Sequence, residues 1–329
     1  FTVPECSKNK KVLLLDSGNG TLTTSRDAGT FSNRVSAINP GSRNFFEKIG
    51  VWENLCAITT PKIVRQLRVW DSCSTSKINF EHENFARDVA YIIENNRIVE
   101  SCRKTFENIN SNFQVKNQSK VTKLKLSENL NDLVMVELDD GSKFTTALLI
   151  GADGVNSKVR STMNSHYVSW SYDQKAIVAT LDINTVKALF FWYLLKSCLT
   201  GDNSIAWQRF TPTGPVALLP LTESKSSLVW TTTSQEAEAL LTLPCDQFVD
   251  ELNKILWEDK NQNKLVNEAL SLFDTYAQTI VPALINLGIS KVEQLPPTVL
   301  DVDPKSRAAF PLGFGHSTNY IAPRAVLIG

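Results

Sequence analysis

The sequence lacks the patterns that identify several common classes of protein. Its 34 lysines and arginines balance 34 aspartates and glutamates, so no net charge favours nucleic acid or an anionic membrane surface. None of the six cysteines forms a C-x-x-C pair, and the three histidines show no i, i+4 spacing. We therefore expect no metal site, no disulfide framework and no nucleic-acid partner, with free thiols in a reducing compartment.

The given sequence also contains no long apolar run, and its first ten residues show no targeting pattern. Residues 1–10 contain neither a signal-peptide core nor an arginine-rich transit pattern, and the first residue is Phe1. The most apolar segment, Val186–Gly201, holds eight consecutive apolar residues, well short of the ~20 that span a bilayer. Three interpretations of segment 186–201 stay open: intron sequence translated into the chain, a buried extra strand, or a membrane contact.

The remaining pattern predicts mixed helix and strand structure in two domains. The apolar run within Lys10–Gly18 is typical of a strand buried on both faces of a parallel sheet. Residues 133–154 predict two strands joined by an Asp-Gly turn, and residues 207–230 predict three strands with turns. Helices are expected at 42–55, at 96–109 and over 246–294.

The stretch "LLIGADGVNSKVR" at Leu148–Arg160 combines a strand, two glycines and an acid. Gly151 and Gly154 are placed where a backbone could approach a pyrophosphate at the carboxyl end of a strand. An ordinary strand-to-helix turn, with Asn156 or Ser157 as the N-cap, explains the same residues. Asp16, at the end of the first strand, is similarly open to a ribose contact or to a turn.

Several motifs together resemble a known family. "LLIGADGVNSKVR" resembles the second flavin motif of the class A flavoprotein monooxygenases, and the final "RAVLIG" resembles the start of their third. "SNRVSAINPGS", "YIIENN", "WQRFTPTGPVALLPLTESKSSLVW" and "KSRAAFPLGFGH" are similar to the ubiquinone-biosynthesis branch, whose mitochondrial members include hydroxylases acting at ring carbon five. The departures are the missing first Gly-rich motif, Asp16 where Glu is usual, and an end before the third motif's aspartate. We therefore expect a piece of a longer protein that binds FAD weakly or not at all by itself.

The resemblance implies an α/β (α+β) fold in two parts. A Rossmann-like FAD-binding domain, incomplete here, is expected from residues 1–60, 85–165 and 305–329. An inserted, mainly antiparallel β-sheet substrate domain is expected from residues 61–84 and 166–304, with the apolar insert at 186–201.

The implied activity is hydroxylation of the aromatic ring of a prenylated phenol with molecular oxygen, using FAD. Electrons would come from a ferredoxin-type or NAD(P)H donor, and the enzyme would lie peripherally on the matrix face of the inner mitochondrial membrane in the coenzyme Q biosynthetic complex. Because the cofactor carries such chemistry, no catalytic side chain is expected. A non-catalytic binding subunit of that complex is the alternative.

The resemblance also implies positions for a site. Cofactor contacts are expected from Asp16, Arg34, Glu94, Asn95, Gly151, Asp153, Gly154, Arg160, Pro311, Leu312, Gly313 and Gly329. Alternatives stay open for several of them: a surface position for Arg34, a helix cap for Asn95, and a turn at Pro311–Gly313. Asp153 is expected to hold backbone N–H groups or Arg160 rather than to face a phosphate, because two anions repel. The aromatic residues that could line a substrate pocket or belong to the core are Trp207, Phe210 and Trp230.

Overall fold

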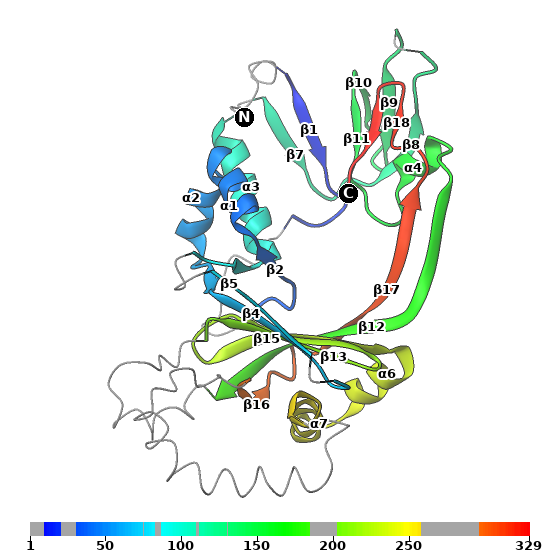
Figure 1. Ribbon diagram of the computed structural model, residues 1–329. Coiled ribbons are helices and arrows are strands. Elements are labelled where there is room, and N and C mark those ends of the chain that lie inside the picture. The colour runs from blue at the N-terminus through cyan, green and yellow to red at the C-terminus, as the bar shows by residue number, and fades with distance from the viewer. Residues whose placement is uncertain are drawn as a thin grey trace, which may run out of the picture.

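The computed structural model describes residues 10–20, 31–74, 76–82, 87–109, 112–129, 131–184, 203–257 and 296–329. Figure 1 shows a large curved sheet with two helices on one side, and a group of smaller sheets and helices on the other. A long pair of strands, β12 (Tyr167–Asn184) and β17 (Ala308–Ser317), runs from the large sheet to the smaller sheets. The segment 186–201 and residues 258–294 of the last expected helical region lie outside the described residues.

The large sheet has eight strands in the order β16-β12-β15-β14-β13-β4-β5, with β17 alongside β12. Its pairs are antiparallel except β13 with β4, as expected for a mainly antiparallel sheet. The other strands and the helices on it are β4 (Gln66–Asp71), β5 (Lys77–Glu81), β13 (Ile205–Thr211), β14 (Gly214–Pro220), β15 (Lys225–Thr233), α6 (Ser234–Thr242), α7 (Cys245–Trp257) and β16 (Thr298–Val302).

Helix α7 seals one face of this sheet. Phe248, Leu252 and Leu256 recur every four residues, so they lie on one side of the helix, and all are at most 2% exposed. They pack with Ile177 and Leu228, both 0% exposed, in the main core cluster. The sequence pattern at 245–257 thus predicted both the helix and its buried face.

The smaller sheets form the other part of the molecule. One sheet has the order β2-β6-β3, one pairs β1 with β7, one has β10-β9-β8, and one has β11-β19-β18. Their elements, with the neighbouring helices, are β1 (Val12–Leu15), β2 (Val35–Ile38), α1 (Pro40–Lys48), α2 (Val51–Ile58), β3 (Lys62–Val64), β6 (Ala90–Glu94), α3 (Asn95–Ile109), β7 (Phe113–Lys116), β8 (Val121–Lys125), β9 (Val134–Leu138), β10 (Lys143–Thr146), β11 (Leu149–Gly151), α4 (Lys158–Thr162), β18 (Ile321–Ala322) and β19 (Ala325–Leu327).

Three expectations about this part were wrong in detail. The helix expected at 42–55 is two helices, because Gly50 adopts a left-handed φ of 74° between α1 and α2. The strand expected to run into Gly151 is split: β10 pairs with β9, whereas β11 pairs with β19 in another sheet. Strand β1 is not buried, since it pairs only with β7 among the described strands and Leu14 is 48% exposed.

The segment Pro311–Gly313 is also not a turn. It lies within β17, where Gly313 pairs with Ser171 and Leu312 pairs with Gln174 of β12. The register shift between those pairs leaves Tyr172 and Asp173 of β12 without a partner in β17, and Asp173 has a left-handed φ of 55°. A β-bulge therefore lies directly opposite the predicted flavin contact.

Candidate functional site

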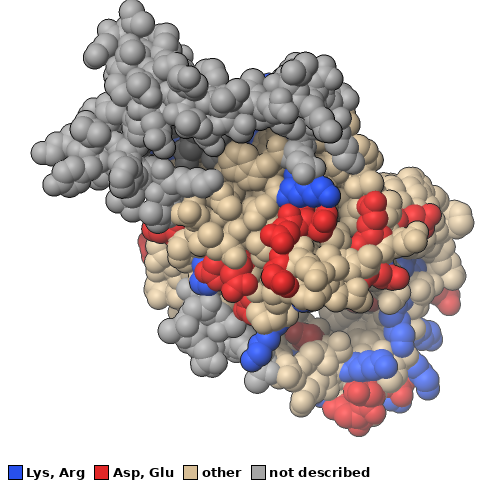
Figure 2. Space-filling model, turned by 90° about the horizontal axis from the view of Figure 1, so that it is seen from below, with Lys and Arg blue, Asp and Glu red and all other residues tan. Residues whose placement is uncertain are grey.

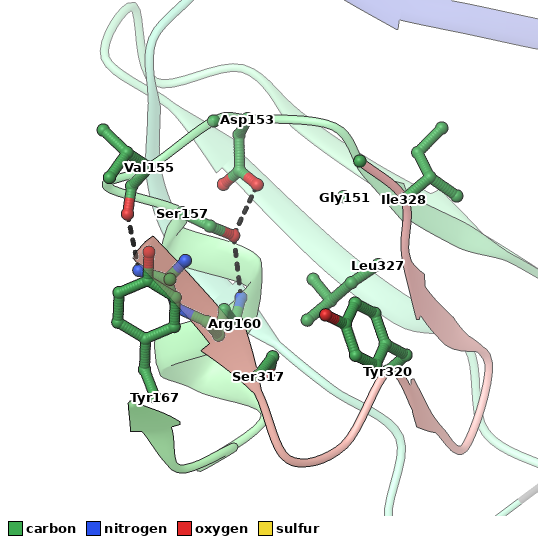
Figure 3. A pocket seen from close by; sticks show the side chains of 13 residues that line it. Gly151, Asp153, Val155, Ser157, Arg160, Tyr167, Ser317, Tyr320, Leu327 and Ile328 are labelled. Carbon is green, nitrogen blue, oxygen red and sulfur yellow. Dashed lines mark hydrogen bonds between the residues drawn. The ribbon is translucent and has the colours of Figure 1, made fainter. Parts of the chain in front are cut away.

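The described residues form a pocket of about 270 Å³ between β11, α4, β19 and the adjoining ends of β12 and β17 (Figure 3). It brings together five of the predicted cofactor contacts from distant parts of the sequence, namely Gly151, Asp153, Gly154, Arg160 and Gly329. The other lining residues are Val155, Ser157, Tyr167, Gly315, Ser317, Tyr320, Leu327 and Ile328. The parallel pairing of β11 with β19 explains this, because both strands end at the same edge.

Asp153 holds the loop between β11 and α4. Its carboxylate accepts hydrogen bonds from the backbone N–H of Lys158 at 2.7 Å, from that of Val159 at 3.1 Å and from the Ser157 hydroxyl at 2.5 Å. Partial burial raises the pKa of Asp153, but the Ser157 and backbone hydrogen bonds outweigh it and hold that pKa below its usual value. The prediction that Asp153 holds backbone N–H groups is confirmed.

Ser157 and Gly151 complete the loop. Ser157 is the N-cap of α4, with its hydroxyl accepting the N–H of Arg160 at 3.0 Å, as the alternative interpretation of this stretch expected. Gly151 allows close packing of strand and helix, since a Cβ there would lie 2.8 Å from Val159 Cβ and 2.9 Å from Leu327 Cδ2. Gly154, at φ 76°, has no atom within 4 Å of its Cβ position, so its backbone is open to a neighbour.

Arg160 does not pair with Asp153. Its guanidinium donates to the carbonyl of Val155 at 2.6 Å and stacks over the Tyr167 ring at 3.7 Å from the centroid (Figure 3). The Tyr167 hydroxyl in turn occupies the space where a Cβ on Gly315 would lie. The sequence did not single out Tyr167 or Gly315, because neither contact follows from spacing along the chain.

The upper part of the β12–β17 pair has two unlike faces. Because side chains alternate along a strand, Ser169 and Ser171 share one face with Gly313 and Gly315. The opposite face carries Trp170 stacked on Phe314 at 4.3 Å between ring centroids. The face of small residues also carries Tyr167 and Ser317, and it therefore borders the pocket.

A second group of predicted contacts gathers around Arg34. The Arg34 guanidinium lies over the Phe310 ring at 4.7 Å, next to Pro311 in β17. Glu94, 5% exposed, accepts the Ser32 N–H at 2.7 Å, and the Asn95 N–H donates to the Arg34 carbonyl at 3.0 Å. Glu94 and Asn95 thus hold the loop that carries Arg34.

Four predicted positions lie elsewhere. Asp16 is exposed and its Oδ1 accepts the Gly18 N–H at 2.8 Å, which is the turn interpretation, and it does not line the pocket. Trp207 and Trp230 are 5% and 4% exposed and belong to the main core on the α7 side of the sheet, as the core interpretation expected. Phe210 points to the other face and is 46% exposed.

Within the described ranges, no helix is long and apolar enough to cross a membrane, and no group of three or more His, Cys, Asp or Glu residues could hold a metal ion. On the face seen in Figure 2, acidic and basic side chains lie interspersed among uncharged residues. The described site therefore offers a ligand the hydrogen-bonding groups of its loops and isolated positively charged side chains.

Solved structures show the class of fold. The chain aligns over 97% of its length with PqsL of Pseudomonas aeruginosa, described as a probable FAD-dependent monooxygenase, at a TM-score of 0.61 and 13% identity, covering 71% of that chain. It aligns equally far with p-nitrophenol 4-monooxygenase PnpA of Pseudomonas putida DLL-E4, at a TM-score of 0.56 and 11% identity, covering 72% of that chain. The fold is that of the FAD-dependent monooxygenases, and the expected α/β fold class is confirmed.

Sequence relatives narrow the family. The chain is 41% identical to the Ubiquinone biosynthesis monooxygenase COQ6, mitochondrial, of Caenorhabditis elegans over 98% of its length, covering 67% of that protein. The same-named proteins of Danio rerio and Homo sapiens are 39% and 37% identical over 97% and 98% of this chain, which covers 63% and 65% of them. No protein-family model matches. The chain belongs to the COQ6 family of ubiquinone biosynthesis monooxygenases, and it spans about two thirds of the length of these relatives.

Proposed function

We propose that this chain forms most of an FAD-dependent monooxygenase that hydroxylates the aromatic ring of a prenylated phenol in ubiquinone biosynthesis. The observation that carries the proposal is the meeting of Gly151, Asp153, Gly154 and Gly329 in one pocket, together with family membership. The non-catalytic alternative has no comparable observation in its favour.

The pocket residues fit part of a dinucleotide. Gly154 has a left-handed φ of 76° and open space beside its Cα, so a ligand can approach its backbone closely. A volume of about 270 Å³ lies below the range of ~300–1,000 Å³ usual for small-molecule sites, so the pocket would hold one segment of FAD. Asp153, engaged by the N–H groups of Lys158 and Val159, would shape the loop around that segment.

Arg34 and β17 would hold the other end of the cofactor. The Arg34 guanidinium, fixed above Phe310, would face the flavin or a phosphate, and the backbone of Pro311–Gly313 would lie against the ring system. Bound FAD would supply the oxygen-transfer chemistry, while the chain orients the cofactor and excludes water from it.

The finer assignments follow the family. We place the protein in mitochondria, peripherally on the matrix face of the inner membrane and in the coenzyme Q biosynthetic complex, with a ferredoxin-type or NAD(P)H electron donor. The names of the relatives, which include "mitochondrial", support the compartment.

The test is to express the protein with the residues that flank this chain in its gene, load it with FAD, and supply a reductant, oxygen and a prenylated phenol. We expect one hydroxyl group added to the ring, detected by mass spectrometry, with FAD absorbance in the purified protein. A protein that binds the phenol but neither holds FAD nor hydroxylates the ring would be the non-catalytic subunit instead.

A further inference from the structure

The two faces of the large sheet differ in polarity and in burial. Trp207 and Arg209 of β13 point toward α7 and are 5% and 1% exposed. The alternate residues Gln208 and Phe210 therefore point to the opposite face, where Gln208 is half-buried and Phe210 is 46% exposed. That opposite face is only partly covered by other described residues.

A continuous row of side chains crosses this second face. Strand register places one residue of the row on each of six neighbouring strands, with each residue directly opposite the next. We call it the open row; its members are Ile78, Val69, Gln208, Ala217, Val229 and Val178. Because neighbouring strands lie ~4.8 Å apart, the open row is about 24 Å long.

The open row is apolar except at one point. Gln208 is its single polar member, and its side chain makes no hydrogen bond within the described part of the chain. A row of this length with five apolar members and one polar member, partly accessible, suits a long hydrocarbon better than a compact polar ligand.

One end of the row reaches the proposed cofactor region. Val178 pairs with Ala308 of β17, and Phe310, two residues further on, lies on the same face under Arg34. The other end reaches the β5 edge of the sheet, where Ile78 is 56% exposed and Phe80 is 50% exposed. The row thus leads from the proposed flavin contact to an apolar surface.

The layer β2-β6-β3 borders the middle of the row, at β4, β13 and β14. Leu67, Ala206 and Leu219, which lie two residues along their strands from the row, pack against Val64 and Ile92 of that layer. In Figure 1 this layer lies on the side of the large sheet opposite α7. A chain lying on the open row would therefore have the sheet beneath it and this layer beside it.

We propose that the isoprenoid tail of the substrate lies along the open row, with the aromatic ring at the Arg34–Phe310 end and the tail leaving over Ile78 and Phe80. This inference rests on the proposed function, since it assigns a place to the tail of that substrate class. Burial of each added isoprene unit on the row removes apolar surface from water, which strengthens binding.

The experiment measures binding of four probes to the FAD-supplemented protein by equilibrium dialysis: one phenol without a tail and the same phenol with one, two and three isoprene units. We expect the affinity to rise roughly tenfold for each unit, because even part of five carbons buried yields that factor. Equal affinity for all four probes would overturn the proposal.

Substitutions in the open row test whether the added affinity of the tailed probes comes from that row. Val229→Thr and Ile78→Asp should each lower the affinity for the three-unit probe by ~3- to 10-fold and leave the affinity for the tailless phenol unchanged. Gln208→Leu should raise the affinity for the three-unit probe. The matched control is Leu300→Asp, since Leu300 is 59% exposed on β16, away from β5 in the strand order of the same sheet. Thermal midpoints of all four variants confirm that they fold.

Two outcomes contradict the assignment. If Leu300→Asp lowers the affinity for the tailed probes as much as Ile78→Asp does, the added affinity comes from nonspecific adsorption to exposed apolar surface. If Val229→Thr, Ile78→Asp and Gln208→Leu all leave the gain unchanged, the tail binds elsewhere. Ring hydroxylation of the tailless phenol is measured in the same samples, so loss of the proposed activity is distinguished from loss of tail binding.

Discussion

The large sheet and the smaller sheets differ in how completely their apolar side chains are buried. On the α7 side of the large sheet, Ile177 and Leu228 are 0% exposed, and Phe248 packs over them. In β1 and β11, by contrast, Leu14 and Ile150 are 48% and 54% exposed. The two regions therefore contribute unequally to the free energy of unfolding.

The difference also separates packing from binding. Around the pocket and Arg34, hydrogen bonds from backbone N–H groups to acidic side chains hold the loops. Examples are the Ser32 N–H, which donates to Glu94, and the Lys158 N–H, which donates to Asp153. Hydrogen bonds fix direction at a modest net free energy, whereas apolar burial supplies most of the stability. Changes in the sheet should thus affect folding, and changes in the loops should affect ligand affinity.

The largest effect is expected from a matched pair of leucines. Leu228→Ala removes a fully buried side chain and should lower the free energy of unfolding by ~2–5 kcal/mol, through lost burial and a cavity. Leu14→Ala, at an exposed position, should change it by less than about 1 kcal/mol. Urea unfolding of both variants measures the contrast. Equal losses would show that the two regions are equally packed.

A smaller effect is expected at Arg34. Arg34→Ala should weaken FAD binding by roughly tenfold to a hundredfold, because ~1.5–3 kcal/mol of charged hydrogen bonding is lost, with little change in the unfolding free energy. Arg34→Lys should lose less, since the charge remains. FAD titration of the flanked protein measures both.

Arg43 is the matched control for that substitution. Its guanidinium also lies over aromatic rings, at 5.3 Å from the Trp52 ring centroid and 5.2 Å from that of Tyr91. It donates a hydrogen bond to the Tyr91 hydroxyl, however, and does not lie next to β17. Arg43→Ala should leave FAD affinity unchanged. A loss of affinity equal to that of Arg34→Ala would mean that the effect comes from helix α1 and not from a cofactor contact.

The smallest effect is expected at Asp153, and it depends on pH. Hydrogen bonds to its carboxylate hold its pKa below the usual value, so its contribution to stability is complete above the unfolded pKa of ~3.9 and is lost as the pH falls through the lower folded pKa. Relative to Asp153→Asn, the native chain should gain about 1 kcal/mol at neutral pH and nothing in strong acid. Thermal unfolding of both between pH 2 and 7 tests this.

Substitution of Asp153 also tests whether this residue shapes the loop or takes part in the chemistry. In the flanked protein, Asp153→Ala should loosen FAD while ring hydroxylation per bound flavin stays largely intact. Normal FAD binding with lost turnover per flavin would assign Asp153 a direct part in catalysis or in flavin reduction, and the contrast between loop and sheet would need another explanation.

Local sequence patterns predicted those helices, strands and turns that depend on residues close together in the sequence. The apolar spacing at 245–257 gave α7, the segment 96–109 gave most of α3, and the turn within 207–221 joined β13 to β14. The N-cap at Ser157 and the loop-holding part of Asp153 were also local, because their partners lie within six residues. Exposure of β1 was missed, since burial depends on neighbours that an apolar run does not specify.

The sequence by itself determined the family, the fold class and five of the thirteen residues that line the pocket, because these lie in motifs that combine residue type with short spacing. Only the tertiary structure decided which face of each strand is open. Trp207 and Gln208 are adjacent in sequence, yet one lies in the core under α7 and the other on the open row. Pairing register and the placement of helices set that difference, and both are long-range properties of the folded chain.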